Sequence, residues 1–330
     1  MNLKGKKVLI TGADGFIGSH LTQRCIAEGA RVRAFVYYNS FGTWGWLDTL
    51  PKGTLDKHEV FSGDIRDFSC VHEACKDVDI VFHLAALISI PYSYKAPESF
   101  IATNITGTTN VLQAARMLGV KKVISTSTSE IYGTAQYVPI DEAHPVNPQS
   151  PYAATKSAAD AMAISFHRSF DLPVTVLRPF NTFGPRQSAR AVIPTIISQI
   201  LSGRKSIKLG NLKSTRDLNY IDNTIDAFIR LAQVDQGYGE VFNTGSGVEV
   251  SIGEVADIIQ KILGTKIKIE RDSQRLRPAK SEVERLVCSC ERLKALTGWK
   301  PEVTLEQGLR KTCAWLKKNL NYYKADIYNV

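Results

Sequence analysis

The sequence predicts an α/β fold built on a doubly wound, parallel β-sheet. Short apolar, β-branched runs alternate with segments of helical periodicity, which is the pattern of strands joined by crossover helices. The first of these runs passes directly into a glycine-rich turn. Sheets of this kind bind ligands beyond the carboxyl ends of their strands, so polar residues at those ends are candidates for a functional site.

Each expected element rests on a local pattern. Apolar runs predict strands at Lys7–Thr11, Arg31–Val36, Val60–Gly63, Val78–His83, Lys121–Ser127, Pro173–Leu177 and Glu240–Thr244. Periodic segments predict helices at Ser19–Glu28, Asn104–Leu118, Tyr152–Phe170, Asn223–Ala232 and Leu305–Asn319. A further helix is expected at Ala191–Leu201, interrupted by Pro194 because proline lacks the N–H that a helix interior needs.

The composition of the chain is that of an ordinary globular protein. Of the 330 residues, 44% are hydrophobic and 22% are charged, which is ordinary for a globular protein with a large core. No apolar run reaches roughly 18 residues, and the start lacks the pattern of a signal peptide, so we expect a cytoplasmic protein without a membrane span. The six dispersed cysteines should be reduced thiols, and no metal site is expected.

The formal net charge of the chain is +9. The basic residues are scattered, and no aromatic-interleaved basic motif occurs, so nucleic-acid binding is not expected. The charge indicates either an ordinary basic surface or a positive field that attracts a diphosphate.

A dinucleotide site is predicted at the first turn, where Gly12, Gly15 and Gly18 stand three residues apart. The first glycine allows the tight turn, the second lets the backbone approach a pyrophosphate, and the third brings helix and strand together. Phe16 and Ile17 lie within this motif and belong to the predicted cofactor contacts. The N-terminus of the helix that follows would hold the phosphate charge.

The second strand ends without the residue that usually separates NAD from NADP sites. Neither an acid nor an arginine stands there; Asn39 and Ser40 follow instead and are expected to bond the ribose hydroxyls. The lack of a basic clamp favours NAD without excluding NADP. Asp64, followed by Ile65, would either accept a bond from the adenine amino group or cap a helix.

The run after the fourth strand should complete the cofactor site. Leu84, Ala85 and Ala86 would let a cofactor pack closely against the backbone. His83, just before them, is expected to be structural, because nothing near it in the sequence pairs with it.

An acid/base site is predicted around Tyr152 and Lys156. Their spacing of four residues places both side chains on one face of a helix. An ammonium near a phenol stabilises the phenolate, so Tyr152 should work as base or acid near neutral pH. Thr128, Ser129 and Glu130 follow a strand at its carboxyl end and complete the predicted catalytic group.

The second half of the chain supplies arginines without a second glycine-rich turn. Arg186, Arg216 and Arg277 are the candidates, because guanidinium groups bind phosphate in a bidentate manner. A diphosphate-bearing substrate is therefore expected.

These residues together resemble the extended short-chain dehydrogenase/reductase superfamily over essentially the whole chain. The matching motifs are TGADGFIG, DI after the third strand, HLAA, Tyr152-x-x-x-Lys156, RPFNTFGPR, TRDLNYID and GWKP. The resemblance implies a Rossmann-type doubly wound parallel sheet with a smaller, interleaved α/β substrate-binding domain. The first domain would span 1–178 and regain about 217–248, and the second would take mainly 179–216 and 249–330. The resemblance also implies a nicotinamide cofactor, a nucleotide-diphosphate sugar, and a homodimer through a four-helix bundle.

Within the superfamily, the triplet Thr128-Ser129-Glu130 is similar to that of sugar 4,6-dehydratases. UDP-glucuronate decarboxylases also carry Thr-Ser-Glu, whereas 4-epimerases usually have small or hydroxyl residues where Glu130 stands. The sequence around Arg216 looks more like a dehydratase than a decarboxylase. The stretches Asn39–Asp48 and Arg186–Ile200 look most like the dehydratase of bacterial legionaminic acid synthesis, which acts on GDP-N-acetylglucosamine.

The resemblance implies a role for each residue of the catalytic group. Tyr152 would take the C4 hydroxyl proton, with its pKa lowered by Lys156, which would also hold the nicotinamide ribose. Thr128 would bond the C4 oxygen, and Glu130 would remove the C5 proton. Ser129 stands where the dehydratases carry Asp or Ser, and in the Asp-containing relatives the aspartic acid would be the general acid. Here Glu130 itself or a water relay would protonate the leaving hydroxyl.

The resemblance also places the substrate. Asn181 and Arg216 would contact the diphosphate, Arg277 would add a phosphate contact, and Val192 would lie near the nucleobase. The competing readings are a decarboxylase or an epimerase of the same superfamily, and a non-catalytic dinucleotide-binding sensor of redox state. The intact set of Thr128, Tyr152 and Lys156 argues against the sensor.

Overall fold

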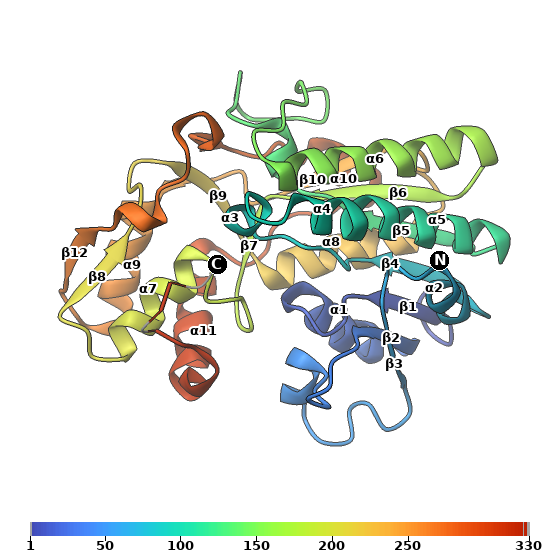
Figure 1. The fold of residues 1–330 in the computed structure, drawn as a ribbon, viewed down its shortest axis with the longest axis horizontal. Helices are drawn as coiled ribbons and strands as arrows, with labels where there is room; N and C mark the ends of the chain where they lie inside the picture. Colours follow the sequence, from blue (N-terminus) through green and yellow to red (C-terminus); the bar gives the residue numbers. More distant parts are fainter. Residues whose placement is uncertain (1, 326, 329–330) are drawn as a thin grey trace.

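A seven-stranded parallel sheet lies at the centre of the computed structural model, which describes residues 2–325, 327 and 328 (Figure 1). The strand order is β10-β6-β5-β4-β1-β2-β3, so the chain starts mid-sheet, moves out to β3 and returns to β4. The predicted doubly wound α/β fold is confirmed. The strands are β1 (Lys7–Thr11), β2 (Arg31–Tyr37), β3 (Glu59–Gly63), β4 (Ile80–His83), β5 (Lys122–Thr126), β6 (Val174–Pro179) and β10 (Val241–Thr244).

Helices cover both faces of this sheet, since parallel strands need crossovers that bury each face. One face packs against α2 (Phe68–Cys75), α5 (Gly107–Met117) and α6 (Pro151–Phe170), and the other against α1 (Phe16–Ala27) and α8 (Ile221–Gln233). Figure 1 shows α5 and α6 lying side by side. Two short helices, α3 (Ile90–Ser93) and α4 (Pro97–Phe100), and a π-helical turn, Ile101–Thr106, lead into α5.

A smaller part of the fold lies beyond the carboxyl ends of the large sheet, at the left in Figure 1. Its first sheet has the order β11-β9-β13, with β7 also pairing with β9, and its second joins β8 and β12 in parallel. The strands are β7 (Asn181–Phe183), β8 (Ser206–Leu209), β9 (Thr215–Tyr220), β11 (Glu249–Ser251), β12 (Lys268–Arg271) and β13 (Arg285–Leu286). Its helices are α7 (Val192–Leu201), α9 (Ile252–Leu263) and α11 (Leu305–Lys318), whereas α10 (Glu291–Thr297) packs beside α8 and beside β10 of the large sheet.

The predicted interruption of the helix at Pro194 is wrong. The helix α7 begins at Val192 and runs unbroken to Leu201, which places Pro194 in its first turn. The N–H groups of a first turn have no partner within the helix, so proline costs little there. The helix α1 also begins three residues earlier than expected, at Phe16, with Gly15 as its N-cap.

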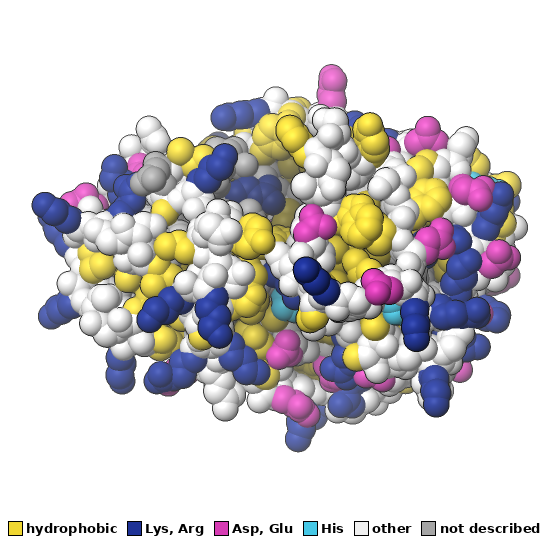
Figure 2. Space-filling view, turned by 90° about the horizontal axis from the view of Figure 1, so that it is seen from below, with side chains coloured by type: hydrophobic (Ala, Val, Ile, Leu, Met, Phe, Trp, Pro, Cys, Tyr) yellow, Lys and Arg dark blue, Asp and Glu magenta, His cyan; other side chains and the backbone are white. Residues whose placement is uncertain are grey.

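The surface shows no single patch of positive charge on the face drawn in Figure 2, where Lys and Arg side chains are dispersed around apolar surface. Among residues 2–325, 327 and 328, no helix is long and apolar enough to span a membrane.

The contact between α1 and β1 generates a prediction about Gly18. A Cβ at Gly18 would lie 2.0 Å from the carbonyl oxygen of Gly12, whereas a Cβ at Gly253, also in a first helical turn, would meet nothing nearer than 3.6 Å. We expect Gly18→Ala to lower the free energy of unfolding by about 1–3 kcal/mol, because neighbouring backbone must shift. Gly253→Ala should be neutral or stabilising. Chemical denaturation of both variants measures the difference, and equal stability would contradict the close approach.

Candidate active site

The glycine turn forms a narrow backbone cradle at the carboxyl edge of the sheet. Gly12 has a φ of +69°, and a Cβ there would lie 2.9 Å from the backbone nitrogen of Ala85. A Cβ at Gly15 would lie 3.2 Å from the Gly12 carbonyl oxygen. The turn therefore packs so closely on neighbouring backbone that side chains do not fit at these glycines. The N–H groups of Phe16 and Ile17 at the start of α1 face no carbonyl within the helix. This arrangement fits a dinucleotide pyrophosphate.

The end of β4 is held against β1 by Thr11. Its hydroxyl oxygen accepts hydrogen bonds from the backbone N–H groups of Leu84 (3.0 Å) and Ala85 (3.1 Å), and Ala86 follows, half-buried. His83 bonds the hydroxyls of Thr11 and Thr108, both at 2.9 Å. Burial, with the charge of Lys156 as a second cause, lowers the pKa of His83 to about 3. These bonds join β1, β4 and α5, which agrees with the expected structural role of His83.

The loop after β2 is organised by Asn39. Its side-chain oxygen accepts from the backbone N–H groups of Phe41 and Thr43, and its amide donates to the carbonyl of Thr43 at 2.8 Å. Ser40 is exposed beside it. The structure thus shows a loop-folding role for Asn39, and ribose binding by Asn39 and Ser40 stays a prediction.

The structure distinguishes between the two roles predicted for Asp64, an adenine contact and a helix cap. Its carboxylate accepts from the Arg66 guanidinium at 2.9 and 3.0 Å, and this hydrogen bond holds the pKa of Asp64 below its usual value. The cap of α2 is Asp67, which accepts from the N–H of Cys70, so the helix-cap reading of Asp64 is wrong. The adenine contact stays a prediction. Ile65 is buried, with its side chain close to Gly107 on α5.

The predicted catalytic residues meet at the carboxyl end of β5. Tyr152 and Lys156 lie on the buried face of α6, and the Lys156 ammonium donates to the carbonyl of Thr126 at 2.6 Å. The hydroxyl of Thr128 bonds Tyr152 and also accepts from the N–H of Glu130 at 3.2 Å. Ser129 is buried next to them, with 2% of its surface exposed. The helix starts where it does because the Ser150 hydroxyl caps it and Pro151 fits its first position.

The expected lowering of the Tyr152 pKa is not what this structure shows. Burial raises the pKa of Tyr152 above its ordinary value, and the negative charges of Glu130 and Asp160 act in the same direction. The hydrogen bond with Thr128 opposes them but is smaller. Burial also lowers the pKa of Lys156, because removing an ammonium from water disfavours its charged form. Tyr152 is thus a neutral hydrogen-bond partner in this state.

Two of the three predicted arginines lie near the catalytic group. The Arg277 guanidinium is 3.4 Å from the Glu130 carboxylate, and Arg216 on β9 is 3.4 Å from the carboxylate of Glu282. The side-chain oxygen of Asn181 is buried and accepts no hydrogen bond from the described part of the chain. Val192 is half-buried at the first position of α7.

Arg186 has a different location. Its guanidinium lies against α1, 3.5 Å from the Ser19 hydroxyl and 3.2 Å from the side-chain oxygen of Gln23. It is buried, with 7% of its surface exposed, and burial lowers its pKa. The structure gives Arg186 a packing role between the turn after β7 and α1, because the left-handed backbone at this residue (φ of +66°) directs it there. It does not bring Arg186 to Arg216 and Arg277.

A buried ion pair that was not predicted from the sequence lies behind Lys156. Asp160 accepts from Arg178 at 3.0 Å and from the Ser127 hydroxyl at 2.8 Å. Arg178 also donates to the Tyr132 hydroxyl at 2.9 Å. Asp160 follows Lys156 by four residues on the same helix face, so the spacing could have indicated it.

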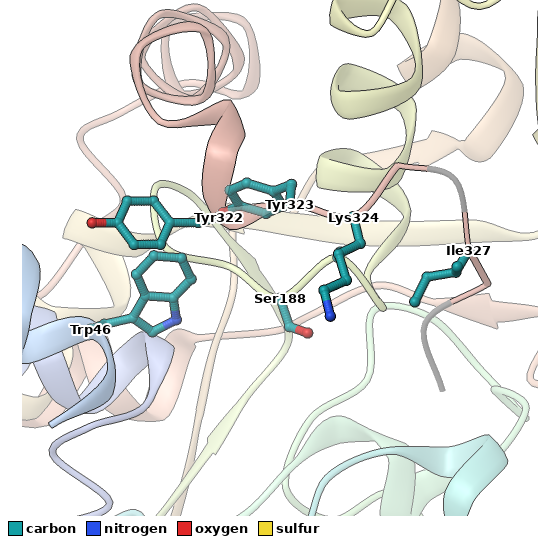
Figure 3. Close-up of a pocket in the computed structure, with 7 residues that line it drawn as sticks. Trp46, Ser188, Tyr322, Tyr323, Lys324 and Ile327 are labelled. Carbon is teal, nitrogen blue, oxygen red and sulfur yellow. The ribbon is translucent and has the colours of Figure 1, made fainter. Parts of the chain in front are cut away.

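A separate hollow of about 360 Å³ lies between the C-terminal segment and the loop after β2. Figure 3 shows the Trp46 ring facing Tyr322 and Tyr323, with Lys324 and Ile327 on the other side of the hollow. Its lining contains none of the predicted catalytic residues.

Comparison with known proteins agrees with this geometry. The family model described as GDP-mannose 4,6 dehydratase matches residues 9–312. The chain belongs to the NAD-dependent epimerase/dehydratase family of the extended short-chain dehydrogenase/reductases. It is thus an enzyme of the group that includes NDP-sugar epimerases, dehydratases and decarboxylases.

Three relatives illustrate the range of reactions in this family. A UDP-glucose 4-epimerase of Mycolicibacterium smegmatis is 34% identical over 317 residues, covering 94% of this chain and 98% of the relative. A UDP-N-acetyl-alpha-D-glucosaminuronate decarboxylase of Bacillus cytotoxicus is 32% identical, covering 95% and 98%. The crystal structure of a dTDP-glucose 4,6-dehydratase from Streptomyces venezuelae, with NAD and TYD bound, matches with a TM-score of 0.87 at 26% identity, covering 96% and 99%.

The raised pKa of Tyr152 can be measured directly. We expect the Tyr152 phenol to stay protonated above pH 10, its ordinary pKa being about 10, in protein without added nucleotide. A spectroscopic titration of tyrosinate in the wild type minus Tyr152→Phe should show no difference signal near that pH. The same subtraction in denaturant, where burial is lost, should show it. A difference signal below pH 10 in the folded protein would contradict the prediction.

Proposed function

We propose that this enzyme is an NDP-sugar 4,6-dehydratase. It would convert a nucleotide-diphosphate hexose, best GDP-N-acetylglucosamine, to the 4-keto-6-deoxy sugar and water. The observation that carries the proposal is the position of Glu130: its backbone bonds the Thr128 hydroxyl, which bonds Tyr152, so a carboxylate stands within the acid/base group. A 4,6-dehydratase needs such a base for C5, whereas C4 epimerisation needs none.

The cofactor in this proposal is NAD. When bound, it would supply the hydride acceptor and donor that the reaction needs, with no net consumption. Gly12, Gly15 and Gly18 would admit its pyrophosphate to the backbone at the start of α1, and Asn39, Ser40 and Asp64 would lie toward its adenosine. The residues that would pack against or hold the rest of it are Phe16, Ile17, Ile65, Leu84, Ala85, Ala86, Tyr152 and Lys156.

The protein's own residues would handle the protons. The neutral Tyr152 of this structure would first have to lose its own proton, and as a phenolate it would then take the proton of the C4 hydroxyl. Thr128 would hold the C4 oxygen, and Lys156 would supply the positive charge that favours the phenolate. The new 4-keto group acidifies C5, and Glu130 would remove its proton. Since Ser129 is a poor acid, Glu130 would return that proton to the leaving C6 hydroxyl, directly or through a water. C6 would then take back the hydride that left C4, and C5 would take a proton from solvent through Glu130, which completes the 4-keto-6-deoxy sugar.

The substrate's diphosphate would bind on the side of the smaller sheets. Arg216 and Arg277 supply the positive charge, and the buried, unpaired oxygen of Asn181 supplies an acceptor for a donor group of the ligand. Val192, at the start of α7, would lie near the nucleobase. The resemblance of Asn39–Asp48 and Arg186–Ile200 to dehydratases of legionaminic acid synthesis supports a GDP sugar.

Two other reactions of the family compete with this one. The epimerase and decarboxylase relatives named above make 4-epimerisation or decarboxylation of a uronic acid the alternatives. A binding-only redox sensor is disfavoured because it would need no buried Tyr152–Thr128 pair.

We also propose that the enzyme forms a homodimer through a four-helix bundle. The helices α5 and α6 pack side by side and would each pair with a copy, and apolar Met117 and Phe170 at their C-terminal ends are 56% and 46% exposed. Burying such surface would favour association.

Mass spectrometry of the purified protein with separate nucleotide sugars tests the function. The panel is GDP-N-acetylglucosamine, UDP-N-acetylglucosamine, dTDP-glucose, GDP-mannose and UDP-glucuronate. We expect loss of one water from GDP-N-acetylglucosamine without net cofactor consumption. Loss of carbon dioxide from UDP-glucuronate would assign a decarboxylase. An isomer of unchanged mass, separated from the substrate by chromatography before mass analysis, would assign an epimerase.

The role of Glu130 gives a second prediction. Glu130→Gln should lower the dehydration rate about 100- to 10,000-fold, because glutamine cannot take the C5 proton. In deuterated water it should also stop isotope entering C5 of the nucleotide sugar. Glu306→Gln on α11, which removes the same charge from an exposed pair with Arg310, is the matched control. Wild-type rates in Glu130→Gln would show that another residue removes the C5 proton.

A further inference from the structure

Four charged side chains form a partly buried cluster next to the catalytic group. Arg277 pairs with Glu130, and Arg216 pairs with Glu282, each at 3.4 Å. These side chains are 8–25% exposed. Both separations exceed the roughly 2.7–2.9 Å of a strong ammonium- or guanidinium-to-carboxylate hydrogen bond. The arginines are thus held by carboxylates, but not tightly.

The segment that carries Arg277 and Glu282 is fastened to the catalytic side of the molecule. The Ser281 hydroxyl bonds the Tyr94 hydroxyl at 2.6 Å and donates to the carbonyl of Gln149, also at 2.6 Å. The Gln149 amide donates to the carbonyl of Lys280 at 3.0 Å. These contacts come from the loop before α6 and from the end of α3, so the segment next to Glu282 is anchored to the protein on both sides of the predicted catalytic helix.

Each arginine of the cluster also interacts electrostatically with the carboxylate of the other pair. Burial acts to lower the pKa of Arg277, but the negative charges of Glu130 and Glu282 outweigh it and raise that pKa. Burial lowers the pKa of Arg216, and Glu130 and Glu282 oppose the shift. Two guanidinium groups and two carboxylates balance one another. A diphosphate entering this cluster adds negative charge, and charge removed from water needs a counter-ion.

We propose that Glu130 and Glu282 are internal counter-ions that hold Arg277 and Arg216 until the diphosphate of the substrate takes both arginines over. Glu282 is then a positioning residue of the diphosphate site. The exchange releases the Glu130 carboxylate from Arg277 when the sugar is in place, so the base becomes available only with a diphosphate bound. This inference rests on the proposed function for the location of the diphosphate.

The exchange predicts that removing either internal anion strengthens diphosphate binding. We expect Glu130→Gln and Glu282→Gln to bind GDP about tenfold more tightly than the wild type, because the ligand no longer competes with a carboxylate. GMP, with one phosphate fewer, should gain less. Arg277→Gln should weaken GDP binding. In the double variant that also carries Glu130→Gln, the affinity for GDP should rise little above that of Arg277→Gln, because the arginine that Glu130 would release is no longer present.

Titration calorimetry of the full chain with GDP, and with UDP and dTDP in parallel, measures these affinities. Glu306→Gln is the control for the loss of one negative charge, and it should leave the affinities unchanged. Thermal unfolding of each variant shows that it is folded, and Glu282→Gln, outside the acid/base group, carries the test if Glu130→Gln does not fold.

The outcomes separate the inference from the proposed function. Unchanged GDP affinity in both glutamine variants, with weaker binding in Arg277→Gln, overturns the counter-ion exchange and leaves the diphosphate site in place. Equal affinity in every variant, or no binding of any of the three diphosphates, overturns the diphosphate site and the exchange together.

Discussion

The docking of one face of α6 on the carboxyl ends of β5 and β6 is the constraint on which the site depends. That face carries Tyr152, Lys156 and Asp160 at successive helical turns, all buried. Burial of charged and polar groups is tolerated only where each has a partner. The carbonyl of Thr126 accepts from Lys156, and Arg178 pairs with Asp160. Losing one member of a buried pair costs about 3–5 kcal/mol, so these contacts fix the helix as well as the predicted catalytic group.

The parallel sheet then determines where the remaining groups can lie. All seven strands end at one edge, so the glycine turn after β1, the Leu84–Ala86 run after β4 and the Thr128–Glu130 segment after β5 share that edge. The smaller sheet that carries Asn181 and Arg216 begins at the same edge, since β7, with Asn181, follows directly on β6, and β9, with Arg216, pairs with β7. The family relation follows from this shared arrangement, while the reaction depends on which acid, base and phosphate ligands stand along it.

The cluster around Glu130 shows that the charged residues of the site affect one another and cannot be assigned roles one at a time. Glu130, a carboxylate of the proposed acid/base group, also neutralises Arg277, an arginine suited to phosphate. In a partly buried site, the energy of each charge depends on the charges around it, so the binding of one ligand changes the electrostatic interactions of several residues. The same principle explains the raised pKa of Tyr152, where burial and two carboxylates outweigh one hydrogen bond.

The sequence by itself determined the features that depend on near neighbours in the chain. Strand–helix alternation predicted the sheet, the three-residue spacing predicted the close contact at Gly18, and the four-residue spacing put Tyr152 and Lys156 on one buried face. Only the tertiary structure decided features that depend on distant partners. Arg277 meets Glu130 across 147 residues, Arg186 turns to α1 rather than to the other arginines, and burial reverses the expected direction of the Tyr152 pKa. Desolvation and ion pairing act through space, and no local pattern records which distant groups the fold brings together.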